Sequence, residues 1–200
     1  MANKDYSASS VKYLLWFVEM RETIKLLRQY PAEKVREIVI DQNVYQQKAP
    51  SRIINEFGCI SRRIESVPEK LTDLMLDTDL STAKMIALVA AMAADRMFFE
   101  LMYEVYREKL RMGEEELKPS DLNIFFSQKA EQSDYVAGLT EATVKKLKQV
   151  YQKWMLEAGI LQKAGKNEKK IVRPYIDPDL RNVLLSNNME SYLYALTGEA

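Results

Sequence analysis

The side chains that carry out most protein chemistry are scarce in this sequence of 200 residues. It contains no histidine and a single cysteine, Cys59. The commonest general base is therefore absent, as are Ser-His and Cys-His nucleophile pairs and most zinc-ligand sets. Phosphate-binding loops of the GxxxxGK[ST] type and the GxGxxG and GxSxG motifs are also missing. We therefore predict no catalytic residue, no metal and no cofactor.

Two acidic clusters are the remaining candidates for metal-dependent catalysis. Asp77 and Asp79 form the first, and Glu114, Glu115 and Glu116 form the second. The tripeptide Glu116-Leu117-Lys118 matches part of a nuclease motif, but the nearby Pro-Asp pair at 178–179 follows it instead of preceding it. Both clusters fall where helices are expected to begin or end, and acidic side chains favour such places. We interpret them as structural and predict that the protein is not an enzyme.

Basic residues are concentrated between residues 143 and 173. Whole-chain charge is uninformative, because Lys plus Arg and Asp plus Glu number 29 each. In this segment, only Glu157 and Glu168 oppose nine basic residues: Lys145, Lys146, Lys148, Lys153, Lys163, Lys166, Lys169, Lys170 and Arg173. A helix from Thr140 to Ala158 and a hairpin from Ile160 to Val172, around AGKNEKK, are predicted here. A short helix, a turn, a basic helix and a basic hairpin follow the order of a winged helix-turn-helix, which binds DNA. Lysines that simply solvate an exposed helix are the alternative.

A second candidate site lies in the N-terminal half. A short helix over 31–40 and a turn ending at Lys48 precede a helix over 51–67. Ser51 and Arg52 lie in its first turn, where recognition helices usually touch DNA. Opposite its apolar stripe the helical pattern places Arg52, Asn55, Glu56, Cys59, Arg62 and Arg63. We predict a helix-turn-helix-like element interrupted by the charge of Glu56. A plain helical hairpin fits the pattern equally well.

The remaining pattern is helical throughout. We expect an all-α, compact bundle of roughly nine to ten helices with one small β-hairpin as a wing, including a first helix over residues 10–30 with Val11, Leu14, Leu15 and Val18 on one face. The run Met85–Ala94 is too short to span a bilayer, which needs about 20 apolar residues. The N-terminus also lacks the apolar stretch of a signal peptide. We expect a cytoplasmic protein without membrane contact, formed by subdomains 1–113 and 114–200.

Three long segments resemble the BrxA proteins of BREX phage-defence systems. These are NVYQQKAPSRIINEFGCISRRIES, LMLDTDLSTAKMIALVAAMAADRMFFELMYEVYREKLRMG and LTEATVKKLKQVYQKWMLEAGIL. The resemblance implies a NusB-like fold with helix-turn-helix-like elements, DNA binding, and a place beside a methyltransferase, a phosphatase-like protein and an ATPase. It assigns DNA contacts to Lys48, Ser51 and Arg52 in KAPSR, and to Thr140, Thr143, Lys145, Lys146 and Lys148 in LTEATVKKLKQV.

The favoured hypothesis is a non-enzymatic accessory protein that binds double-stranded DNA. Its predicted nucleic-acid-binding residues are Lys48, Ser51, Arg52, Arg62, Arg63, Thr140, Thr143, Lys145, Lys146, Lys148, Lys169 and Lys170. An RNA-binding protein is one alternative, suggested by the NusB-like fold. A protein-protein adaptor is the other, with an apolar surface from residues 85–102 or the C-terminal NMESYLYAL. Because it carries more charge, the C-terminal site is expected to dominate DNA binding.

Overall fold

A computed structural model describes residues 5–165 and 168–199 of the chain. In order, its elements are η1 Ser9–Lys12, α1 Phe17–Leu27, α2 Ala32–Asp41, α3 Pro50–Glu65, α4 Glu69–Asp77, α5 Leu80–Ala94, α6 Arg96–Leu101, η2 Met102–Tyr106, α7 Arg107–Met112, α8 Pro119–Gln132, α9 Asp134–Ala137, α10 Glu141–Glu157, β1 Leu161–Lys163, β2 Lys169–Ile171, α11 Pro178–Ser186 and α12 Glu190–Thr197. The prediction of an all-α fold with one hairpin is confirmed for these residues.

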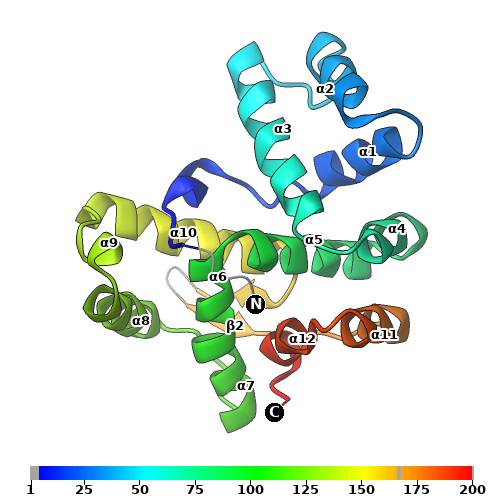
Figure 1. Cartoon of the computed structure of the whole chain (residues 1–200). Helices are drawn as coiled ribbons and strands as arrows, with labels where there is room; N and C mark the ends of the chain where they lie inside the picture. Colours follow the sequence, from blue (N-terminus) through cyan, green and yellow to red (C-terminus); the bar gives the residue numbers. More distant parts are fainter. Residues whose placement is uncertain (1–4, 166–167, 200) are drawn as a thin grey trace.

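The helices surround a central apolar helix, α5. Every residue from Met85 to Ala93 is buried, and α5 contacts α1, α3, α4, α6 and α10. Figure 1 shows α1, α2 and α3 grouped at one end, α10 crossing the middle of the molecule, and α11 and α12 on the side away from α3. Within residues 5–165 and 168–199, none of the helices is both long and apolar enough to cross a membrane. The run Met85–Ala94 is therefore core, as predicted.

The beginning of the chain differs from the predicted helix over residues 10–30. Residues 9–12 form a 3-10 turn, residues 13–16 are not helical, and α1 starts only at Phe17. Trp16 has a φ of 53°, the left-handed region, which interrupts a right-handed helix. The carbonyl oxygens of Leu14 and Leu15 accept hydrogen bonds from Arg63 instead of from a helical turn. The sequence pattern was wrong here because a tertiary contact satisfies the backbone.

Residues 96–112 form one continuous helix, α6–η2–α7, with a π-helical segment inside it. Its first turn is capped by Asp95, whose carboxylate accepts from the backbone N–H of Phe98 at 3.0 Å. Residues 102–106 form η2, and the helix ends at Gly113 with a φ of 71°. The hydroxyl of Tyr106 donates to the carbonyl of Val172 at 3.1 Å, just beyond β2. The helix α6–η2–α7 thereby holds the hairpin against the core.

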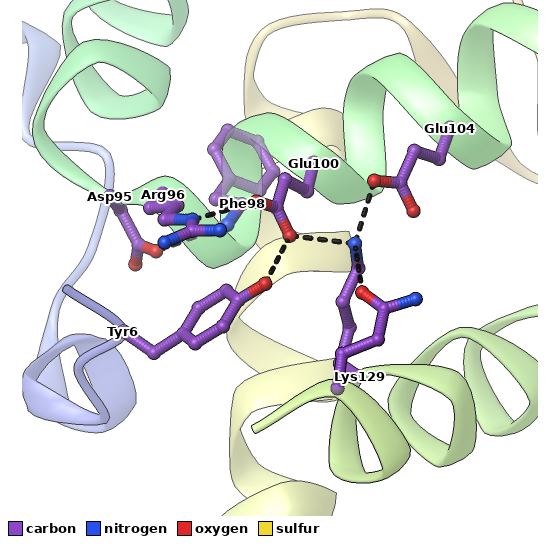
Figure 2. A network of polar contacts seen from close by, with 8 residues as sticks. Tyr6, Asp95, Arg96, Phe98, Glu100, Glu104 and Lys129 are labelled. Atoms are coloured by element: carbon purple, nitrogen blue, oxygen red, sulfur yellow. Dashed lines mark hydrogen bonds and ion pairs between the residues drawn. The ribbon is translucent and has the colours of Figure 1, made fainter. Parts of the chain in front are cut away.

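A buried charge network fixes α8 against the helix α6–η2–α7. Lys129 of α8 is 3% exposed, and its Nζ lies 2.7 Å from Glu100 Oε2 and 2.6 Å from Glu104 Oε1. The hydroxyl of Tyr6 donates to the same Glu100 carboxylate at 2.7 Å, and Arg96 lies 2.7 Å from its other oxygen (Figure 2). Burial raises the pKa of Glu100, but these donors outweigh burial and lower it overall. The network places α8 where it can support α10.

Contacts also cross residue 113, the predicted subdomain boundary. Helix α11 contacts α4, and α12 contacts η2 and α7. The hydroxyl of Tyr151 in α10 donates to Asp95 at 3.0 Å. Helices of residues 1–113 therefore pack against helices of residues 114–200. The division into two subdomains stays a prediction.

Candidate nucleic-acid interface

Helix α10 has one buried and one basic side. Its N-cap is Thr140, as predicted, whose hydroxyl accepts from the backbone N–H of Thr143 at 3.2 Å. Leu147, Tyr151 and Trp154 are at most 1% exposed and fix the helix on the core. Lys145, Lys146 and Lys153 are exposed on the other side. Together with Thr140 and Thr143, these three lysines are called the α10 surface below.

The lysines of the α10 surface have no carboxylate within 4 Å among the residues that the structure describes. Their charges are therefore available to an anionic partner. Lys148 is different, because its Nζ donates to Asn123 Oδ1 of α8 at 2.7 Å and lies 5.3 Å from the centre of the Phe126 ring. Burial lowers the pKa of Lys148. This predicted contact residue is half-buried and links α10 to α8.

The hairpin is less basic in three dimensions than in sequence. Within the hairpin itself, Lys163 of β1 lies opposite Lys169 of β2, and Gln162 lies opposite Lys170. The charge that reduces its basic character comes from another part of the chain. The acidic segment 115–117 runs along the other edge of β2: Ile171 N–H donates to the Glu115 carbonyl at 2.8 Å, and Leu117 N–H to the Lys169 carbonyl at 3.0 Å. Glu116 is thereby brought beside Lys170. Lys166, counted above among the nine basic residues, lies outside the described residues.

This pairing was not visible in the sequence. Residues 115–117 are separated from β2 by more than 50 positions, and one isolated bridge leaves no alternating apolar pattern to detect. Arg173 is also occupied, since its guanidinium donates to the carbonyl of Leu110. The excess of positive charge therefore lies on α10 more than on the hairpin.

The two acidic clusters lie at the ends of helices: Asp77 at the end of α4, Asp79 just before α5, and Glu114 just after α7. Asp79 caps α5 by accepting from Ser81 N–H at 2.7 Å and from the hydroxyl of Thr82 at 2.6 Å. Glu114 pairs with Lys109 at 2.6 Å. Across residues 5–165 and 168–199, no group of three or more His, Cys, Asp or Glu side chains is placed to hold a metal ion.

The N-terminal candidate site lies at the start of α3. Helices α2 and α3 contact each other and α1, and residues 42–49 join them. Lys48, Ser51 and Arg52 are all exposed at this end, which points away from the rest of the molecule (Figure 1). Arg62 is exposed near the other end, and its guanidinium donates to the Gly58 carbonyl and to the Tyr13 hydroxyl, each at 3.1 Å. These four residues are called the α3 surface below.

Arg63 does not belong to any surface, and its prediction as a nucleic-acid contact is corrected here. It is 2% exposed, donates to the carbonyls of Leu14 at 3.0 Å and Leu15 at 2.6 Å, and lies 4.7 Å from the centre of the Trp154 ring. Burial lowers the pKa of its guanidinium. The side chain joins α3 to residues 14–15 and α10, which is a structural role.

Glu56 and Cys59, also predicted for the polar side of α3, are buried at 2% and 4% exposure. Burial raises the pKa of Glu56 to about 7, and Glu19 of α1 adds to the shift. The carboxyl group therefore does not interrupt an exposed basic surface. The N-terminal segment 8–16 packs along this side of α3, and its irregular backbone gave no sequence signal.

The two apolar surfaces expected for an adaptor are largely internal. Of the Met-rich stretch 85–102, Met85, Met92, Met97 and Met102 are at most 3% exposed. In the C-terminal segment, Leu193, Ala195 and Leu196 are fully buried. These segments form core and do not provide the patch that was predicted.

Known proteins share both the sequence and the fold. The family model described as BrxA matches residues 4–188. A BREX protein BrxA from Bacillus cereus (strain H3081.97) is 34% identical over 186 residues, which cover 92% of each chain. The crystal structure of an uncharacterized protein from Magnetospirillum magneticum superposes with a TM-score of 0.83 at 17% identity, covering 98% of this chain and 100% of that chain. The last likeness concerns the fold alone.

Proposed function

Because the chain belongs to the BrxA family of BREX phage-defence proteins, we propose that it binds double-stranded DNA as a non-catalytic component of such a system. The α10 surface is the principal contact, and the α3 surface is a second, weaker one. The proteins it works beside are the other BREX components, among them the methyltransferase, the phosphatase-like protein and the ATPase.

The observation that carries this proposal is the set of unpaired lysines on a rigidly seated helix. Lys145, Lys146 and Lys153 are exposed, while Leu147, Tyr151 and Trp154 of the same helix are buried. Lysines that neutralise phosphates release counterions, and this supplies most non-specific affinity for DNA. A seated helix keeps the charges in place, so that little further ordering is needed on binding.

The order of elements supports duplex DNA as the partner. Helices α8, α9 and α10 are followed by the hairpin β1–β2, which is the order of a winged helix-turn-helix. In that arrangement α10 enters the major groove, with Thr140 and Thr143 at its N-terminal end near phosphates or base edges. Lys169 and Lys170 of β2 then lie near the sugar-phosphate backbone.

The α3 surface contributes in the same manner. Lys48, Ser51 and Arg52 stand at the N-terminus of α3, where backbone N–H groups and the helix dipole favour a phosphate. Arg62 is partly engaged by Tyr13 and Gly58 and adds less. A helix-turn-helix-like α2–α3 pair reaching a second segment of the duplex fits this geometry.

Affinity for a labelled duplex tests the proposal, measured across salt concentrations. Lys145, Lys146 and Lys153 are changed together to Glu, leaving Lys148 intact because of its bond to Asn123. Reversal of three phosphate contacts should weaken binding on the order of a hundredfold and flatten the salt dependence, at about 0.9 in slope per contact. The control changes three exposed basic residues outside α2, α3 and α10, namely Lys25, Arg28 and Lys70, to Glu.

Equal losses in both triple variants would show that net charge alone matters and would contradict the assignment to α10. Single-stranded DNA and RNA are titrated in parallel. Tighter binding of RNA than of duplex DNA would favour an RNA-binding protein instead, and no binding to any nucleic acid would favour an adaptor.

A further inference from the structure

An open cleft lies between the N-terminal segment and α3. It has a volume of about 840 Å³ and is lined by residues 8–9, 11–14 and Trp16 on one side, and by Gln47, Arg52, Asn55 and Glu56 on the other. None of these residues belongs to the α10 surface. The cleft adjoins Arg52 of the α3 surface, so a ligand held there would lie beside the second DNA contact proposed above.

Glu56, on the inner wall of this cleft, has a carboxyl oxygen that lacks a hydrogen-bond donor among the described residues. The residue is 2% exposed, and its Oε2 accepts from Gln47 Nε2 at 2.9 Å. Its Oε1 is buried without a hydrogen-bond partner in the part of the chain that the structure describes. Buried carboxyl oxygens are normally paired, because leaving one unpaired is costly.

The surrounding charges do not meet this need. Glu56 has no Lys or Arg within 4 Å in the described chain, although Arg52 lies one turn earlier on α3. Among charged residues, Glu19 of α1 has the strongest effect on Glu56, and it repels the ionised Glu56 carboxylate. The hydroxyl of Tyr45 is hydrogen-bonded to Thr23. Burial accordingly raises the pKa of Glu56 to about 7. A ligand that donates an N–H would stabilise the ionised carboxylate.

The opposite wall is suited to a flat, partly apolar ligand. Tyr13 and Trp16 are half-exposed, their ring centres lie 5.4 Å apart, and Leu14 is 40% exposed beside them. Trp16 is held at a φ of 53°, which bulky residues rarely adopt and which is concentrated at ligand sites. Aromatic walls stack nucleobases without regard to sequence. Lys12 and Arg52, both exposed and both lining the cleft, suit a phosphate.

We propose that this cleft binds a nucleotide whose base carries an exocyclic amino group, with that group donating to Glu56 and the phosphate beside Arg52. The inference deepens the proposed function by naming the chemical group recognised at the α3 surface. Cytosine, adenine and guanine offer the amino donor. Thymine offers an imide N–H flanked by two carbonyl oxygens, which would face the carboxylate. The nucleotide is either an unstacked residue of a DNA strand or a free mononucleotide.

Isothermal titration of the whole protein with dCMP, dAMP, dGMP and dTMP tests the chemistry. Wild type should bind the three amino-bearing nucleotides at least about tenfold more tightly than dTMP, since a hydrogen bond to a charged group is worth that much. Glu56→Gln should reduce the difference to less than about threefold. Glu33→Gln, which removes an exposed carboxylate on α2, should leave it unchanged.

A second variant covers the case in which Glu56→Gln fails to fold. Asn55 is exposed and lines the cleft, so Asn55→Trp fills it from the outside without touching the core. This variant should lose binding of all four nucleotides while its circular dichroism matches wild type. Unchanged nucleotide binding in a folded Asn55→Trp variant would overturn the assignment to this cleft.

Duplexes with an unpaired cytosine, an unpaired thymine or neither identify the source. Preference for the unpaired cytosine over the unpaired thymine indicates a base within a strand, whereas equal binding of the duplexes together with discrimination among mononucleotides indicates a free nucleotide. Equal affinity of wild type for dCMP and dTMP, and for both unpaired duplexes, would overturn the inference.

The variant with Lys145, Lys146 and Lys153 changed to Glu separates the two proposals. It should lose duplex affinity and keep its discrimination among mononucleotides. If wild type fails to bind any duplex yet prefers dCMP to dTMP, the proposed function fails and the cleft assignment stands. If duplex binding depends on α10 and the four mononucleotides bind equally, the proposed function stands and the cleft assignment fails.

Discussion

Helices α3 and α10 carry similar charges in sequence and use them in different ways. On α10, Lys145, Lys146 and Lys153 project into solvent. On α3, Glu56 and Arg63 turn inward, each 2% exposed, while Arg52 stays outside. The charged side chains of α10 are therefore exposed to solvent, whereas part of the charge of α3 is buried and contacts other segments of the fold.

The difference comes from what covers the polar side of each helix. Residues 8–16 lie beside Glu56 and Arg63 on this side of α3, whereas no described segment covers the lysines of α10. A helical pattern identifies the apolar side of a helix, but a charged residue on the other side is exposed only if nothing else packs there. Three predictions test this contrast.

The largest effect is expected from Arg63→Ala. The substitution removes two hydrogen bonds to the carbonyls of Leu14 and Leu15 and the contact with Trp154, so the free energy of unfolding should fall by about 3 kcal/mol. Urea denaturation measures it. The folded variant should bind duplex DNA as wild type does.

Arg62→Ala is the control, because it removes the same charge one residue earlier from an exposed position. Its stability should change by no more than about 0.5 kcal/mol. A loss of DNA affinity in Arg63→Ala with unchanged stability would reverse the roles assigned to the two arginines.

An intermediate effect is expected from Glu56→Gln, and it depends on pH. The pKa of Glu56 is raised from 4.5 to about 7 in the folded protein, so its contribution to stability is full below pH 4.5 and is lost as the pH rises to 7. The variant lacks this titration. It should match wild type at pH 4 within error and exceed it by roughly 2 kcal/mol at pH 8.

Denaturation at a series of pH values measures this difference, with Glu33→Gln as the matched exposed carboxylate. A stability difference between Glu56→Gln and wild type that stays constant from pH 4 to pH 8 would mean that the carboxyl group titrates normally. In that case the Glu56 carboxylate of α3 would be in contact with solvent, as the lysines of α10 are.

The smallest effect is expected from Arg52→Ala, the exposed arginine of α3. Loss of one phosphate contact should weaken duplex binding about fivefold, close to 1 kcal/mol, with stability unchanged within about 0.5 kcal/mol. Arg28→Ala, an exposed arginine at the end of α1, is the control. A loss from Arg52→Ala that exceeds the loss from the triple lysine variant would make α3 the principal contact.

Much of the fold followed from local patterns, because caps and apolar periods act within a few residues. Thr140 and Asp79 each mark a helix end that the sequence indicated. The misplaced helix over residues 10–30 failed where Arg63, about 50 residues away, binds the carbonyls of Leu14 and Leu15. The site residues depended on such distant contacts too: Lys148 meets Asn123, and β2 meets the acidic segment 115–117. Only a folded chain brings these together.

The π-helical segment η2 has a consequence for the length of the chain at this point. A π-helical turn holds one residue more than an α-helical turn, and such turns are often found at functional positions. Removing one residue between Met102 and Tyr106 would therefore return this turn to α-helical geometry and keep Leu110, which is 2% exposed, facing the core. Removing one residue from the α-helical first turn of α7 would instead rotate everything after it by about 100°. A single-residue deletion should therefore be tolerated better within residues 102–106 than in α7, and one-residue gaps in aligned orthologous sequences are expected at 102–106.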